Sequence, residues 1–86
     1  MTTKLTGVRV GNIKSKLIIS NSIHVLRAEK RLSQQQLAEA IGVTRATVNA
    51  LEGGNYNPSL ELAFRLARFF ELNLNDIFKV EGERHE

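Results

Sequence analysis

Residues 33–59 read SQQQLAEAIGVTRATVNALEGGNYNPS, and this stretch decides the fold. Ser33 followed by Gln36 has the spacing of a capping box, which predicts a helix that begins at Gln34. Gly42 follows the last apolar position of that helix and accepts a left-handed C-terminal conformation without a steric penalty. Thr44 then caps a further helix over residues 45–51. The stretch therefore predicts two short helices joined by a tight turn.

The turn is too short for these two helices to lie antiparallel, so they must cross steeply. Ala38 provides the small side chain that a close crossing needs, and apolar residues lock one helix on the other: Ile41, Val43, Val48 and Leu51. The exposed face of the second helix then carries short or hydrogen-bonding side chains: Arg45, Ala46, Asn49 and Ala50, with Thr44 and Thr47 at its edge. Such a helix fits a DNA major groove about 12 Å wide.

Helical patterns continue on both sides of this stretch. Upstream, residues 20–22 offer N-caps for a helix that ends near Arg31. Downstream, Ser59 caps a helix to about residue 70, and Asn73 with Asp76 opens a short helix to residue 78 or 79. We therefore expect an all-α, five-helix domain over residues 21–79, followed by a polar, frayed tail over residues 80–86.

Residues 1–20 form an extension of a different kind. They contain no acidic residue and are rich in β-branched residues. Two readings stay open: a short β-hairpin that pairs residues 5–10 with residues 13–19 across Gly11-Asn12, or a flexible basic tail.

Composition excludes several classes of protein. A chain of 86 residues forms one domain with a thin core, burying about 60–65% of its unfolded surface. It has no cysteine, and its only histidines, His24 and His85, lie far apart, so we expect no metal and no cofactor. No phosphate-binding loop or nucleophile motif indicates an enzyme. No apolar run approaches the ~20 residues of a membrane span, so we expect a cytoplasmic protein without membrane contact.

The net charge of +3 is unevenly distributed. Residues 1–56 hold eight basic and three acidic residues, whereas residues 57–86 hold four basic and six acidic ones. The positive end therefore includes the two crossing helices, which suits a polyanionic partner.

The central stretch resembles the helix-turn-helix of the Cro/C1-type family of prokaryotic and phage regulators, also called the xenobiotic-response-element family. The matching residues are Leu37, Ala38, Gly42, Val43, Val48, Leu51, Glu52, Gly54, Pro58 and Ser59. The resemblance continues over about residues 21–79 and implies a compact, lambda-repressor-like DNA-binding domain, often dimeric and mostly a transcriptional repressor.

The resemblance also implies roles for individual residues. Thr44 caps the recognition helix beside a phosphate, and Gln34 and Thr47 contact phosphates. Base edges face Arg45, Ala46, Asn49 and Ala50; arginine suits guanine, asparagine suits adenine, and alanine suits a thymine methyl group. Residues 53–55 depart from the family, which often has Asn-Gly-Lys there, so one basic phosphate contact is absent.

The helix over residues 60–70 is apolar almost all round, which indicates cover on several sides. A single buried stripe would use Leu60, Ala63, Ala67 and Phe70. The remaining apolar residues predict a homodimer interface: Leu62, Phe64, Phe69, Leu74, Ile77 and Phe78. Alternatively, the N-terminal extension folds back and covers them within one chain.

We therefore expect a sequence-specific regulator that binds a double-stranded DNA operator, acting as a homodimeric repressor on a palindrome. The alternative is an antitoxin or accessory module that binds a toxin-like partner protein, either alone or together with its own promoter.

Overall fold

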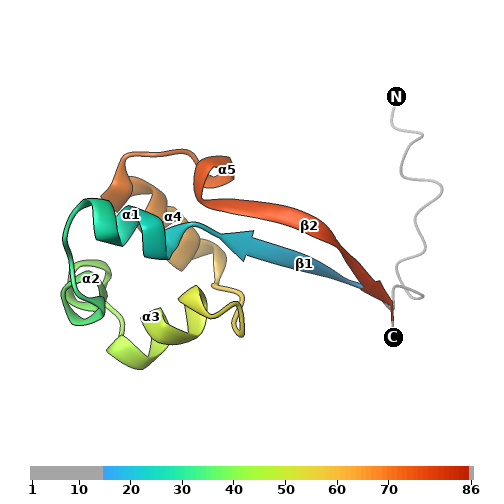
Figure 1. The fold of residues 1–86 in the computed structure, drawn as a ribbon, viewed down its shortest axis with the longest axis horizontal. Coiled ribbons are helices and arrows are strands. Elements are labelled where there is room, and N and C mark those ends of the chain that lie inside the picture. The colour runs from blue at the N-terminus through green and yellow to red at the C-terminus, as the bar shows by residue number, and fades with distance from the viewer. Residues whose placement is uncertain (1–14, 86) are drawn as a thin grey trace.

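Five helices and two strands follow one another along residues 15–85, the part of the chain that this computed structural model describes (Figure 1). In chain order they are β1 (Ser15–Asn21), α1 (Ile23–Glu29), α2 (Gln34–Ile41), α3 (Arg45–Glu52), α4 (Leu60–Phe70), α5 (Leu74–Ile77) and β2 (Phe78–His85). The predicted five-helix domain is confirmed. No helix within these residues is long and apolar enough to cross a membrane.

The predicted starts of α2 and α4 are confirmed by their caps, whereas Ser22 before α1 makes no side-chain capping hydrogen bond. Ser33 Oγ accepts from the Gln36 N–H at 3.0 Å, and Gln36 Oε1 accepts from the Ser33 N–H at 2.8 Å, which completes the capping box. Ser59 Oγ accepts from the Leu62 N–H at 3.1 Å at the start of α4. Gly42 ends α2 with φ +79°, the left-handed conformation expected of it.

The buried core consists of side chains from all five helices, and Phe78 of β2 packs half-buried against it. Its buried members are Ile23, Leu37, Ala38, Ile41, Val48, Leu51, Leu62, Leu66, Ala67, Phe70 and Ile77. The predicted stripe of α4 is wrong at Leu60, which is 69% exposed. Leu62, Leu66 and Phe70 are instead spaced four residues apart, so they lie on one face of α4, and that face meets the core.

The two strands form an antiparallel sheet that joins the two ends of the described chain. Their register runs from Asn21 opposite Phe78 to Ser15 opposite His85, with an irregularity between Ile18 and Ile19. The expected frayed tail is wrong, and so is the extension of the last helix to residue 78 or 79. The chain leaves α5 beside β1, where its backbone groups find hydrogen-bond partners across the sheet.

The described part of the N-terminal extension is a strand, as the hairpin reading expected, but the partner seen for it is at the other end of the chain. Residues 15–21 pair with residues 78–85, and the expected partner segment, residues 5–10, lies outside the described residues. The domain boundaries after residues 20 and 79 remain predictions, and both fall within paired strands.

Candidate nucleic-acid interface

The crossing of α2 and α3 is held by apolar contacts on their inner faces. Leu37, Ala38, Val48 and Leu51 are each at most 1% exposed. The Gly42 and Val43 N–H groups both donate to the Ala38 carbonyl at 2.9 Å, which closes the turn between the helices. The opposite face of α3 is therefore directed away from the core.

This outer face presents the side chains predicted to contact DNA. Thr44, Arg45, Ala46 and Asn49 are exposed, whereas Thr47 and Ala50 are half-buried. Thr44 Oγ1 accepts from the Thr47 N–H at 3.2 Å, as expected of an N-cap. Within the described residues the Arg45 side chain makes no hydrogen bond or ion pair, so its guanidinium is available to a ligand.

A polar network behind this face links three helices. The carboxylate of Glu52, at the end of α3, accepts hydrogen bonds from Arg27 Nε at 2.7 Å and from Arg27 Nη2 at 3.2 Å. Gln34 Nε2 donates to Glu52 Oε1 at 3.1 Å and to Asn49 Oδ1 at 3.3 Å. The structure therefore brings Gln34 and Asn49 together, and the amide of Gln34 orients that of Asn49.

Burial of Glu52 disfavours its charged form, because its side chain is only 9% exposed. Hydrogen bonds from Arg27 and Gln34, together with the guanidinium charge, more than offset that penalty. The pKa of Glu52 is therefore held below its ordinary value of 4.5. The hydrogen bond to Glu52 likewise raises the pKa of Arg27.

Sequence reasoning missed this ion pair. Arg27 and Glu52 are 25 residues apart, and no periodicity connects the two helices. The signal in the sequence is the position of Glu52 at the end of the second helix of the helix-turn-helix, because a carboxylate that is buried there needs a cation as its partner. The His24 side chain is 72% exposed, and its Nδ1 lies 3.8 Å from Glu52 Oε1. No cluster of three metal-ligating side chains occurs within residues 15–85.

The residues predicted to form a dimer interface divide into three groups. Leu62 and Ile77 are 6% and 1% exposed, so their assignment to an interface is wrong: they pack in the core of one chain. Phe69, Leu74 and Phe78 are half-buried against that core. Phe64 is 49% exposed.

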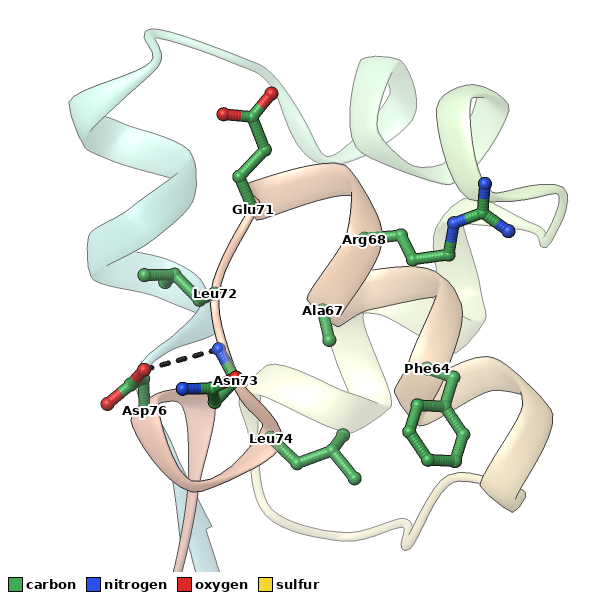
Figure 2. Close-up of a pocket in the computed structure, with 8 residues that line it drawn as sticks. All are labelled: Phe64, Ala67, Arg68, Glu71, Leu72, Asn73, Leu74 and Asp76. Atoms are coloured by element: carbon green, nitrogen blue, oxygen red, sulfur yellow. Dashed lines mark hydrogen bonds between the residues drawn. The ribbon is translucent and has the colours of Figure 1, made fainter.

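Phe64 and Leu74 come together at a depression between α4 and α5 (Figure 2). Ala67 lies between them, and Arg68 and Glu71 line the side nearer the end of α4. We call these two residues the Phe64–Leu74 patch; it contains the most exposed of the side chains predicted for dimerisation, Phe64.

Two short helices that cross steeply after a tight turn, the second with an exposed polar face, are the arrangement of helix-turn-helix DNA-binding proteins. The helix-turn-helix family matches residues 23–77 of this sequence. The chain belongs to this family, in its Cro/C1-type branch, and is a transcriptional regulator.

Relatives cover most of the chain. An HTH-type transcriptional regulator of Methanocaldococcus jannaschii is 43% identical over 65 residues, which are 76% of this chain and 98% of the relative. The cryptic phage CTXphi transcriptional repressor of Vibrio cholerae is 35% identical over 60 residues, which are 70% of this chain and 54% of the repressor.

Solved structures show the same fold. The restriction-modification controller protein C.AhdI from Aeromonas hydrophila is 33% identical, with a TM-score of 0.58. The similarity covers 63% of this chain and 82% of that protein.

Proposed function

We propose that this chain is a cytoplasmic transcriptional repressor that binds a palindromic DNA operator as a homodimer. The observation that carries the proposal is the exposed face of α3, where an unpaired Arg45 lies beside Asn49. The Vibrio cholerae relative is named a transcriptional repressor, which supports repression rather than activation.

In this proposal α3 enters the major groove and reads base edges. Arg45 donates two hydrogen bonds to a guanine, and Asn49 pairs with an adenine. In the free chain Asn49 Oδ1 accepts from Gln34 Nε2, and release of this bond on DNA leaves both Oδ1 and Nδ2 of Asn49 to pair with the adenine. Ala46 and Ala50 contact thymine methyl groups.

The phosphate contacts come from the edges of the two helices. Thr44 and Thr47 lie at the N-terminus of α3, where backbone N–H groups and the helix dipole favour an anion. Gln34 reaches a phosphate by giving up its 3.3 Å bond to Asn49, the longer of its two.

Dimerisation in this proposal uses the Phe64–Leu74 patch. The support is that Phe64, the most exposed residue of the predicted interface, lies beside the half-buried Leu74 at one depression. Two copies related by a two-fold axis place two recognition helices about 34 Å apart, one turn of DNA.

Selection of binding sites from random duplex DNA tests the proposal. We expect enrichment of a palindrome whose half-sites are centred one helical turn apart. Enrichment of a single asymmetric half-site overturns the homodimer. Failure to enrich any sequence overturns DNA recognition and favours the alternative, a module that binds a toxin-like partner protein.

A further inference from the structure

We propose that the sheet of β1 and β2 is a second DNA-binding element, which holds the phosphate backbone next to the segment contacted by α3. The contact lies in a groove between β1 and the loop that follows α3, here called the sheet–loop groove. Its polar side chains are Lys16, Asn55, Tyr56, Asn57 and Arg84. The inference rests on the proposed function, since α3 must be bound to DNA for the groove to meet it.

The charges of the sheet–loop groove are of one sign. Lys16 and Arg84 line it, and no acidic side chain does. Both cations are exposed, and within residues 15–85 neither makes an ion pair or a side-chain hydrogen bond. Two cations among amides and a phenol match the groups that proteins use to bind DNA phosphates.

The strand register makes this pair of cations unfavourable without an anion. Lys16 lies directly opposite Arg84 in the antiparallel ladder, so both side chains project from the same face of the sheet. Like charges at opposed positions destabilise a sheet. Glu83 lies opposite Leu17, one position away, and therefore projects from the other face. A phosphate between Lys16 and Arg84 removes their repulsion.

Hydrogen bonds fix the sheet relative to the recognition helix. Asn21 Nδ2, at the end of β1, donates to the Leu51 carbonyl in the last turn of α3 at 2.8 Å. Its Oδ1 accepts from the Ile23 N–H at 3.0 Å, which holds that side chain in place. The groove therefore begins where α3 ends, and the sheet extends outward from the helices on the side of the loop after α3 (Figure 1).

This placement favours DNA over a protein as the occupant. Residues 54–57 of the sheet–loop groove follow shortly after α3, and the exposed side chains of α3 are cationic or neutral. A duplex that contacts α3 must continue past its ends. Backbone contacts by the sheet add affinity without sequence information.

Salt dependence of binding measures these contacts directly. The variants are Lys16→Gln, Arg84→Gln and the two combined, with Lys79→Gln as the control. Lys79 is an exposed lysine of β2 that lines a different depression, so its replacement makes the same change in charge outside the groove. Binding to the selected operator is followed by fluorescence anisotropy between about 50 and 200 mM salt, the range over which phosphate contacts dominate.

We expect each single variant to reduce the slope of log K against log salt by about 0.9 per bound chain, and the double variant by about 1.8. The preferred base sequence stays unchanged, as does the slope for Lys79→Gln. Hydroxyl-radical footprinting of the double variant loses protection next to the half-site and keeps it within the half-site. Circular dichroism confirms that each variant retains its helices, and Lys16→Arg keeps the original slope.

Two different results overturn the inference. If the original chain binds its operator and the double variant keeps the same slope and footprint, the sheet makes no backbone contact, while the proposed function stands. If the original chain binds no duplex, the proposed function fails and the inference fails with it.

Discussion

Arg45 is the side chain on which base recognition depends most strongly in our proposal. Replacing it with alanine removes a bidentate donor to guanine, so discrimination at one base position falls by about 1–3 kcal/mol. Anisotropy titrations with the selected operator and its single-base variants measure this loss. Lys30→Ala, at an exposed lysine that follows α1, is the control. An unchanged base preference in the Arg45 variant contradicts its role.

Glu52 stabilises the crossing of the helices, because its carboxylate neutralises the charge of Arg27 and accepts a hydrogen bond from Gln34. The Arg27 side chain is only 15% exposed, and Glu52→Gln leaves its charge without a counter-ion. We therefore expect a loss of about 2–3 kcal/mol in the free energy of unfolding. Urea denaturation measures it. The control is Glu61→Gln, whose ion pair with Arg65 is exposed, with an expected loss of at most about 1 kcal/mol. Equal losses contradict the distinction.

Protonation of the Glu52 carboxylate at acidic pH should lower the free energy of unfolding. The folded-state pKa of Glu52 lies below 4.5, so the unfolded chain takes up the proton first as the pH falls. Its stabilising contribution is present near neutral pH and is lost as the pH falls below about 5 and through the folded-state pKa. Urea midpoints between neutral and acid pH should fall less steeply for Glu52→Gln than for the original chain. Parallel curves argue against this linkage.

At the scale of elements, the helices should fold without the sheet. Every residue of the buried cluster belongs to a helix, whereas Leu17, Ile18 and Val80 are 50%, 40% and 60% exposed. A chain that ends after Lys79 should therefore keep its helical circular dichroism. We expect its thermal midpoint to fall by less than about 8 °C, the shift that 1 kcal/mol produces in a small domain. Loss of the helical signal shows that β2 is required for folding.

The helices and the strands were not equally predictable. Each of α2, α3 and α4 begins at a capping side chain, and such caps act over three residues, so the local sequence shows them. The strands pair residues about 60 positions apart. No local pattern reveals that residues 15–21 lie beside residues 78–85, because the helices between them bring the two segments together.

At the scale of the whole molecule, the Phe64–Leu74 patch determines the oligomeric state that we propose. Sedimentation equilibrium at tens of micromolar should give twice the 9.6 kDa mass of one chain. Phe64→Glu places a charge on a side chain that is 49% exposed, so the fold tolerates it while the dimer dissociates. Leu60→Glu, at a 69% exposed residue of the same helix that does not line the patch, is the matched control. A monomeric original chain overturns the dimer.

The helix-turn-helix follows from local sequence alone, because its caps, its left-handed glycine and the inward stripes of α2 and α3 are all local features. The local sequence also indicated which side chains α3 exposes, because the buried and exposed positions of a helix alternate with a fixed period. Only the tertiary structure decided which apolar residues of α4 face the core, since a helix that is apolar all round has no unique inner face. The tertiary structure also paired Arg27 with Glu52 and placed Lys16 opposite Arg84. Those pairs depend on the path of the whole chain, which brings residues distant in sequence to the same place.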